Sequence, residues 1–178
     1  MSAGTGTSET ILLLGGARSG KSRRALALAE AGADAAATSP VFIATAESTD
    51  AEMAARIAAH RRERGPRWQT VEAPLDICGA LTRHRGEVCV VDCLTLWLSN
   101  LMFADEDVLD ATTSLAEAVG NHGACLVLVC NEVGLGLVPE TALGRAFRDA
   151  QGRLNQHMAT ICDRVEFLAA GLPLTLKP

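Results

Sequence analysis

The chain has 178 residues, of which 48% are hydrophobic, and a formal net charge of −5 at pH 7. The length and apolar content fit one domain with a full core. The acidic balance argues against a nucleic-acid partner, and no apolar run reaches the length of a membrane span. Residues 1–9 lack the basic start and apolar core of a secretion signal. We therefore expect a flexible N-terminal extension over residues 1–9, a single catalytic domain over residues 10–178 and a cytoplasmic protein.

The first predicted strand, over residues 11–14, leads into a phosphate-binding loop and a helix-prone segment. The loop reads Gly-Gly-Ala-Arg-Ser-Gly-Lys-Ser, a complete P-loop in its required strand-to-helix context. Its glycines allow successive amides to face phosphate oxygens at the positive end of the helix. We expect Lys21 to reach the β- and γ-phosphates and the Ser22 hydroxyl to ligate Mg²⁺, whereas Arg18 either adds charge there or is solvated. The predicted nucleotide-binding residues are Gly15, Gly16, Ala17, Arg18, Ser19, Gly20, Lys21 and Ser22.

The helix after the P-loop is expected to end near residues 32–33, before a second buried strand. Residues 41–44 are apolar and rich in strand formers, which predicts a parallel strand of the interior. Thr45, Ala46 and Glu47 follow it directly. Open α/β sheets bind their ligands at the carboxyl ends of strands, so these three residues are candidates for a site.

A helix is predicted over residues 51–64, and Glu52, Arg56 and His60 lie on one face of it because they recur every four residues. This face has two interpretations. It is either a solvated surface with an ordinary ion pair, or a face of the nucleotide site with His60 as nucleophile or acid/base. Four arginines close by are either a phosphate clamp or a solvated charge run. They are Arg61, Arg62, Arg64 and Arg67.

Residues 68–71 are a further predicted strand, which Glu72 follows, and a short helix is expected over residues 75–84. Residues 88–92 form an apolar strand that ends in Asp92. An acid at this place downstream of a P-loop helps to hold Mg²⁺, directly or through water. A long helical stretch from about residue 94 to residue 119 is broken near residues 105–107.

The last predicted elements surround a loop that is rich in glycine. Residues 125–130 form a buried strand, and residues 131–140 are either a substrate loop or an ordinary connection to the helix over residues 140–163. The final two strands form an edge hairpin around residues 170–171. Strands that alternate with helices in this way indicate an α/β sheet, and the six cysteines lack the spacing of a zinc or redox pair.

Several of these stretches together resemble one family, the bifunctional adenosylcobinamide kinase / adenosylcobinamide-phosphate guanylyltransferases. The P-loop is generic, but the Glu-x-x-x-Arg-x-x-x-His helix and the Asn-Glu-Val-Gly loop are specific when they occur together. The resemblance spans nearly the whole chain beyond the first nine residues. The similar stretches are residues 15–22, 43–45, 52–61, 68–72, 131–140 and 147–156.

The resemblance implies a RecA-like P-loop NTPase fold with a mostly parallel sheet, flanking helices and an antiparallel C-terminal edge hairpin. It also implies two reactions with Mg²⁺, in which GTP and ATP are substrates. The enzyme phosphorylates adenosylcobinamide and then transfers GMP from GTP to that phosphate through a guanylylated histidine, which matches His60. Family members are homotrimers, so a homo-oligomer is implied.

Further site residues follow from the same resemblance. It places GTP contacts, besides the P-loop, at Thr45, Ala46, Glu47, Arg62, Glu63, Arg64, Gly65, Glu72 and Asp92. Candidates for the loop that handles the corrinoid are Asn131, Glu132, Gly134 and Gly136.

Two other functions compete with this interpretation. A generic P-loop small-molecule kinase would use the same loop with His60 as a bystander. A GTP-binding switch would need an Asn-Lys-x-Asp element, but the strand over residues 125–130 is followed by Asn-Glu-Val-Gly. The sequence therefore favours an enzyme over a switch.

Overall fold

The computed structural model of the chain describes residues 8–47, 58, 61–62 and 64–178. Most of the helix predicted over residues 51–64 lies outside the described residues, and so do residues 1–7 of the predicted extension. Of the residues discussed above, Glu52, Arg56, His60 and Glu63 fall outside them.

The described residues contain a seven-stranded sheet with the strand order β3-β2-β4-β5-β1-β6-β7. All neighbouring strands are parallel except β6 and β7, which form an antiparallel hairpin at one edge. The strands are β1 (Thr10–Gly15), β2 (Val41–Ala44), β3 (Gln69–Glu72), β4 (Cys89–Asp92), β5 (Leu126–Asn131), β6 (Arg164–Ala169) and β7 (Leu172–Lys177). The helices are α1 (Lys21–Ala36), α3 (Ile77–Arg83), α4 (Leu94–Phe103), α5 (Val108–Gly120) and α6 (Ala142–Ile161).

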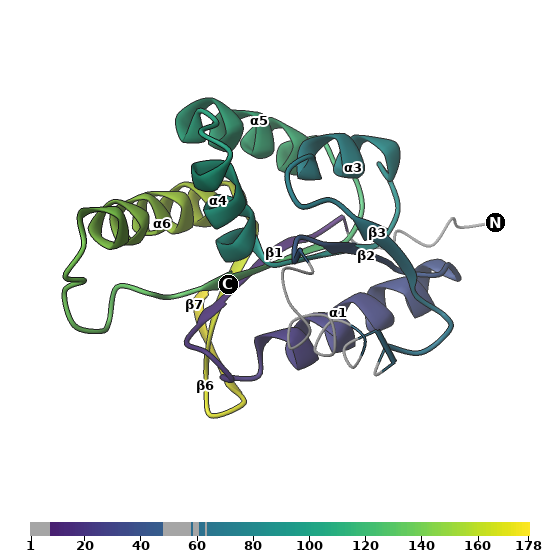
Figure 1. Cartoon of the computed structure of the whole chain (residues 1–178). Coiled ribbons are helices and arrows are strands. Elements are labelled where there is room, and N and C mark those ends of the chain that lie inside the picture. The colour runs from purple at the N-terminus through teal and green to yellow at the C-terminus, as the bar shows by residue number, and fades with distance from the viewer. Residues whose placement is uncertain (1–7, 48–57, 59–60, 63) are drawn as a thin grey trace.

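Helices cover both faces of this sheet. Figure 1 shows α1 on one face and α3, α4, α5 and α6 on the other. Side chains of a strand alternate between faces, so the apolar run of β1 serves both layers. Ile11 and Leu13 pack in the cluster with α1, whereas Leu12 and Leu14 pack in the cluster with the other helices. The predicted α/β fold with a mostly parallel sheet and a C-terminal edge hairpin is confirmed.

The predicted end of the first helix was wrong. Helix α1 continues to Ala36, and Ala37 ends it with a left-handed φ of 54°. Gly32 is therefore not a helix stop. A Cβ at Gly32 would lie 3.2 Å from the Cβ of Cys125, so this glycine allows the helix to pack closely on the sheet.

The cysteines are free thiols, and four of them are buried: Cys89, Cys93, Cys130 and Cys162. This agrees with the absence of paired spacing in the sequence. In the part of the chain that the structure describes, no helix has both the length and the apolar character that a membrane crossing requires.

A buried histidine lies between β4, β5 and the end of α5. His122 is 1% exposed. Its Nε2 donates a hydrogen bond to the carbonyl oxygen of Glu87 at 2.8 Å, while Nδ1 has no partner among the described residues. Burial lowers the pKa of His122 below the ordinary value of 6.5. The carbonyl bond and the charge of Glu87 oppose this shift, and the charges of His84 and Arg85 add to it.

The lowered pKa of His122 predicts a pH-dependent stability. Because the unfolded chain binds the proton more readily, this contribution is fully present above pH 6.5 and is lost as the pH falls toward the folded-state pKa. We expect the free energy of unfolding in urea to decrease from about pH 7.5 to about pH 5. His122→Gln keeps an amide donor for Glu87 but does not titrate, so its profile should be flatter.

The matched control for this prediction is His157→Gln, because His157 is exposed. This variant should retain the wild-type pH dependence of unfolding. An unchanged slope in His122→Gln would show that other groups cause the acid sensitivity.

Candidate active site

Within the described part of the chain, predicted site residues lie at the carboxyl edge of five neighbouring strands, β3, β2, β4, β5 and β1. The register pairs Ala44 with Asp92 and Gly15 with Asn131. Thr45 and the P-loop begin directly after β2 and β1. This edge thus carries the P-loop after β1 and Asp92 at the end of β4. The glycine-rich loop begins between them, at the end of β5.

The P-loop ends in a helix whose first turn is open to an anion. Helix α1 begins at Lys21, and its N-cap residue is Gly20, with a φ of 100°. Gly20 has no side chain that can accept bonds from the first amides of the helix. These amides and the positive end of the helix dipole can therefore bind phosphate oxygens.

Lys21 is buried and held by the loop that precedes it. The residue is 6% exposed, and its Nζ donates to the carbonyl oxygens of Gly15 (2.9 Å) and Gly16 (2.6 Å). Burial lowers the pKa of Lys21, and the negative charge of Asp92 opposes this effect. The ammonium group is thus held beside the loop and within electrostatic range of Asp92. In this position it can exchange its carbonyl partners for phosphate oxygens.

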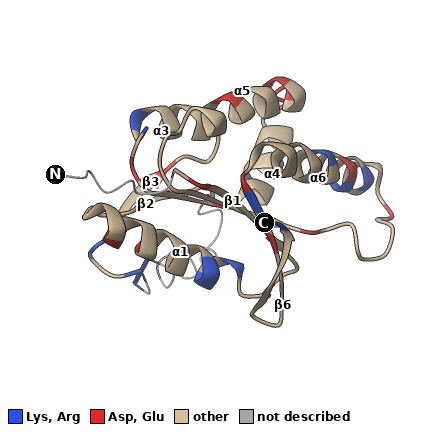
Figure 2. Ribbon diagram, turned by 180° about the vertical axis from the view of Figure 1, so that it is seen from behind, with Lys and Arg blue, Asp and Glu red and all other residues tan. Residues whose placement is uncertain are grey.

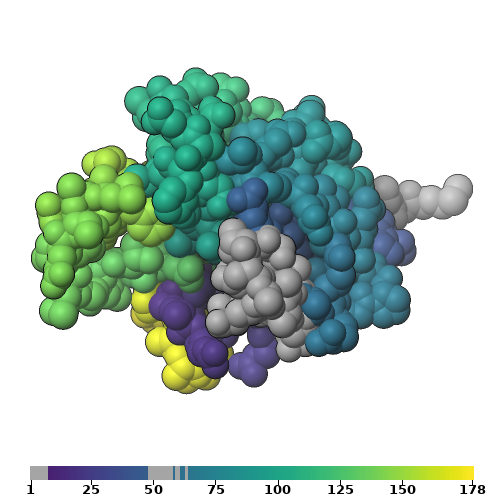
Figure 3. Space-filling view, in the orientation of Figure 1, coloured from purple at the N-terminus to yellow at the C-terminus, as the bar shows by residue number. Residues whose placement is uncertain are grey.

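The C-terminal hairpin braces the P-loop, which no motif in the sequence indicated. The main-chain N–H of Gly171, in the β6–β7 turn, donates to the carbonyl oxygen of Ser19 at 2.9 Å. A Cβ at Gly15 would lie 2.6 Å from the carbonyl oxygen of Leu168, and one at Gly20 would lie 3.1 Å from the Cα of Gly171. Figure 3 shows the early part of the described chain, in purple, beside the yellow hairpin. The glycines therefore serve close packing as well as the turn itself.

An ion pair fastens the first turns of α1 to β6. Arg24 donates from Nε to one carboxylate oxygen of Glu166 at 2.9 Å and from Nη2 to the other at 2.8 Å. This bidentate bond is the main cause that lowers the pKa of Glu166, whose side chain is 4% exposed. Figure 2 marks basic residues at the start of this helix. The pair limits movement of α1 relative to the sheet.

Thr45 joins two strands of the site edge. Its buried Oγ1 donates to the carbonyl oxygen of Cys93 and accepts from the N–H of Cys93, both at 2.8 Å. The amide of Asn100 donates to the carbonyl oxygen of Thr45 at 2.9 Å. The Thr45 side chain is therefore engaged in the scaffold, while Glu47 after it is exposed.

The arginines after the predicted helix divide into two groups. The guanidinium carbon of Arg64 lies 3.7 Å from the ring centroid of Phe42, and Arg64 also donates to Thr70 Oγ1 at 3.3 Å. Burial lowers the pKa of Arg64. Arg67 pairs with Asp34 on α1. These two arginines have structural partners, so they do not form a simple solvated charge run.

Arg61 and Arg62 lie in the more exposed group of these arginines. Arg61 pairs with Glu72 across 3.3 Å, and both side chains are mostly exposed. Arg62 is exposed as well. Glu72 pairs in register with Ala44, so this pair lies at the same edge of the sheet as Asp92.

A buried polar network behind the site was not foreseen from the sequence. It connects α4, β5 and α6 through hydrogen bonds among Thr95, Cys130, Asn131, Gln151 and Asn155. Gln151 and Asn155 lie within the stretch over residues 147–156 that carries the family resemblance. Their spacing of four residues on a helix, next to buried Leu154 and Met158, was the available signal.

The glycine-rich loop after β5 is anchored at its start and exposed in its middle. The N–H of Glu132 donates to the carbonyl oxygen of Gly15 at 3.1 Å, and the carboxylate of Glu132 accepts from the N–H of Gly134. Further along, Leu137 is 97% exposed. Figure 1 shows the loop extending away from the sheet before α6 returns. Gly136 lies in this exposed part.

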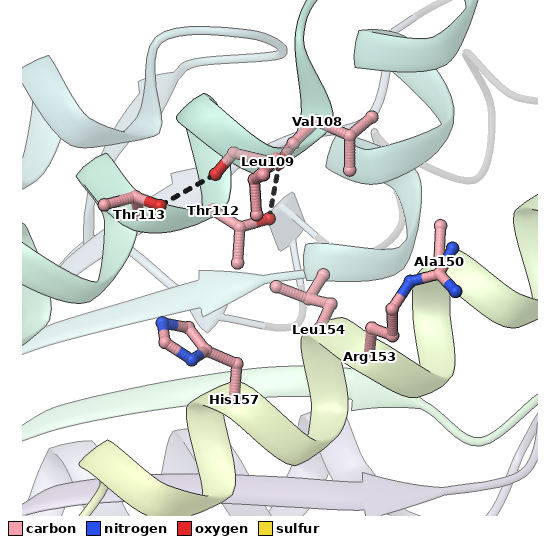
Figure 4. A pocket seen from close by; sticks show the side chains of 8 residues that line it. All are labelled: Val108, Leu109, Thr112, Thr113, Ala150, Arg153, Leu154 and His157. Atoms are coloured by element: carbon pink, nitrogen blue, oxygen red, sulfur yellow. Dashed lines mark hydrogen bonds between the residues drawn. The ribbon is translucent and has the colours of Figure 1, made fainter.

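A hollow lies between α5 and α6, away from the edge that carries the P-loop. Its volume is about 380 Å³, and Figure 4 shows its lining. The lining residues are Val108, Leu109, Thr112, Thr113, Ala150, Arg153, Leu154 and His157. None of them is among the candidate site residues, so the hollow is not part of the site described above.

Comparison with known protein families identifies the family of the chain. The profile of the family described as cobinamide kinase / cobinamide phosphate guanyltransferase matches residues 11–176. The chain belongs to this family. The match includes the P-loop and Asp92, and it confirms the resemblance inferred from the sequence.

Relatives of this cobinamide kinase family member agree over nearly their full lengths. A bifunctional adenosylcobalamin biosynthesis protein CobP of Pseudomonas aeruginosa is 45% identical over 170 residues, which cover 93% of this chain and 96% of the relative. A bifunctional adenosylcobalamin biosynthesis protein CobU of Escherichia coli is 39% identical over 184 residues, which cover 94% and 99% of the two chains.

The fold of this cobinamide kinase family member also resembles that of a solved KaiC-like protein from Pyrococcus horikoshii. The TM-score is 0.52 at 16% identity, and the match covers 89% of this chain and 70% of that chain. This likeness concerns the fold alone, and it agrees with the RecA-like P-loop class expected from the sequence.

Two residues at this edge of the sheet, Ser22 and Asp92, are the metal donors expected from the sequence. Among the residues that the structure describes, no group of three or more His, Cys, Asp or Glu side chains is placed to hold a metal ion. Ser22 lies in the first turn of α1, and Asp92 is the last residue of β4. Mg²⁺ in nucleotide sites keeps several waters and phosphate oxygens as ligands, so few protein donors are needed.

Proposed function

We propose that the chain phosphorylates adenosylcobinamide with a nucleoside triphosphate and then transfers GMP from GTP to the phosphate. The products of the second step are adenosylcobinamide-GDP and pyrophosphate. The observation that carries this proposal is the buried Lys21 at the open end of α1, within electrostatic range of Asp92, in a chain of the cobinamide kinase family. Both steps break a bond to phosphorus in a bound triphosphate, so one cradle serves them.

In both steps the chain's own groups act by positioning and by electrostatic stabilisation. The first amides of α1 and the Lys21 ammonium bind the phosphate oxygens on which negative charge increases. Ser22 and Asp92 would hold Mg²⁺, which supplies charge neutralisation to the phosphates. For the second step we assign His60 as the group that accepts GMP. A neutral imidazole is a competent nucleophile near pH 7.

The outer parts of the site serve recognition. We assign Glu47, Glu72 and residues 62–65 to contacts with the nucleotide, as the sequence resemblance implies. The loop that begins at Asn131 and Glu132 would handle the corrinoid, because its middle is apolar and exposed while its start is bonded to the P-loop.

The exposed apolar side chains also support a homo-oligomer, with the trimer as the proposed state. Leu135, Leu137 and Val138 are exposed on the loop, and Leu172, Leu174 and Leu176 are exposed on β7, which ends the sheet. An open edge strand with apolar side chains is a surface that proteins normally cover. We place this assembly in the cytoplasm.

The experiment that tests the proposed function follows the products over time by mass spectrometry. With adenosylcobinamide, Mg²⁺ and ATP alone, the expected product is adenosylcobinamide phosphate. Addition of GTP should then yield adenosylcobinamide-GDP and pyrophosphate, and a chelator of Mg²⁺ should stop both reactions. A product series that stops at the phosphate in the presence of GTP would favour the plain kinase, and no product at all would exclude both.

A further inference from the structure

The last residue of β5 is held at both of its main-chain groups by side chains from two helices. The N–H of Asn131 donates to Thr95 Oγ1 on α4 at 2.7 Å. Its carbonyl oxygen accepts from Asn155 Nδ2 on α6 at 3.3 Å. These side-chain bonds to the backbone add to the pairing of Asn131 with Gly15 on β1, and they fix the end of the strand before the loop that follows it.

Asn155 is itself fixed by two buried neighbours. Its Oδ1 accepts from Gln151 Nε2 at 3.0 Å and from the thiol of Cys130 at 2.9 Å. Burial raises the pKa of Cys130 to about 12, so the thiol keeps the proton that it donates. Gln151 is fully buried, and its Oε1 has no hydrogen-bond partner among the described residues. An unpaired buried oxygen lowers stability, so stability alone does not explain the network.

The fixed strand end is connected to the catalytic lysine through one carbonyl group. The residue after Asn131 is Glu132, whose N–H donates to the carbonyl oxygen of Gly15 at 3.1 Å. The same oxygen accepts from Lys21 Nζ at 2.9 Å. A displacement of the β5 end would therefore move a partner of the ammonium group.

We infer that Thr95, Gln151 and Asn155 are positioning residues that hold Lys21 through Asn131, Glu132 and the Gly15 carbonyl. Their importance for catalysis rests on the proposed function, whereas their effect on the geometry of Lys21 does not. The network also fixes the start of the proposed corrinoid loop, so the same hydrogen bonds align both substrates' binding segments.

The test uses the fact that the chain contains only two lysines, Lys21 and Lys177. Lys177 Nζ also donates to main-chain carbonyls, including that of Cys162 at 2.6 Å, so it is an internal reference for an ammonium in a similar setting. The rate of acetylation of each lysine by an amine-reactive reagent is measured by peptide mass spectrometry, without nucleotide. The variant is Thr95→Val, which keeps the shape of the side chain but removes the acceptor for Asn131.

In Thr95→Val, we expect the acetylation rate of Lys21 relative to Lys177 to change by about fivefold, as for groups within one hydrogen-bond network. The conservative Thr95→Ser retains the hydroxyl and should restore the wild-type ratio. Thr112→Val is the matched control, because Thr112 Oγ1 bonds to Val108 within α5, away from the network. In the two reactions, Thr95→Val should lower kcat more than it raises the KM for GTP.

An unchanged ratio of the two lysines in Thr95→Val would overturn the inference. This includes an equal rise of both acetylation rates, since that pattern means general loosening of the fold. If Thr95→Val does not fold, Gln151→Met removes both amide donors with a side chain of similar length and must change the ratio. A wild-type protein without kinase or transferase activity would overturn the proposed function, while the lysine ratio would still decide the positioning role.

Discussion

Lys21→Ala is expected to lower kcat for both the kinase and the guanylyl-transfer step by about 10²–10³-fold. Lys21 is one of two lysines in the chain, and its ammonium group lies at the P-loop. The other lysine, Lys177, contacts the end of α6. Because phosphoryl transfer depends on electrostatic stabilisation of the phosphate oxygens, its loss acts on the transition states of both steps. Steady-state rates of the two steps, measured separately, check this expectation.

The controls for Lys21→Ala separate catalysis from folding. Lys177→Ala removes the other lysine and should retain activity in both steps. Lys21→Arg keeps a positive charge but should not restore activity, because a planar guanidinium does not reproduce the two hydrogen bonds that the compact ammonium donates to the Gly15 and Gly16 carbonyls. Full guanylyl transfer by Lys21→Ala with an unchanged Tm would remove this residue from the phosphate site.

His60→Ala is expected to abolish guanylyl transfer and to leave the kinase step largely intact. In the proposed mechanism a ring nitrogen of His60 bonds to the α-phosphorus of GTP as the bond to the bridging oxygen breaks and pyrophosphate leaves. An oxygen of adenosylcobinamide phosphate then displaces the imidazole. The kinase step uses the P-loop but needs no covalent nucleotide, so it should persist.

The measurement is the intact mass of the protein after incubation with GTP and Mg²⁺ alone. Wild type should gain one guanylyl group, and His60→Ala should gain none. His157→Ala is the matched control, since His157 is an exposed histidine on α6 and should leave the adduct unchanged. An adduct of equal yield on His60→Ala would assign the nucleophile to another residue, and equal loss of both steps would make His60 a shared or structural residue.

The sequence predicted the elements well where the pattern has a single physical cause. Short apolar runs rich in strand formers indicate strands of a buried parallel sheet, and the P-loop requires a strand before it and a helix after it. The end of α1 was misjudged because Gly32 has two possible roles. Its close approach to Cys125, which belongs to a segment distant in sequence, decides between a helix stop and a packing site.

The location of the P-loop and Asp92 at one edge of the sheet was predictable from the sequence, and the segments that support them were less so. The hydrogen bond between Gly171 and Ser19 joins the C-terminal hairpin to the P-loop through main-chain atoms. Main-chain groups are the same in nearly every residue type, so the sequence does not indicate this contact. Thr95, Gln151 and Asn155 are ordinary polar residues on helices, and only tertiary packing buries them. The arginines were open to two interpretations because a charge run does not reveal its partners, whereas the structure pairs Arg64 with Phe42 and Arg67 with Asp34.

The position of β1 in the sheet has a consequence for how the protein is made. This strand is synthesised first among the described strands, but its two neighbours are β5 and β6, which come much later in the chain. The strand before the P-loop therefore cannot pair with β5 and β6 until most of the chain has left the ribosome. The apolar residues 11–14 remain unpaired during that time, so translation speed and chaperone contact should affect the yield of nucleotide-competent protein.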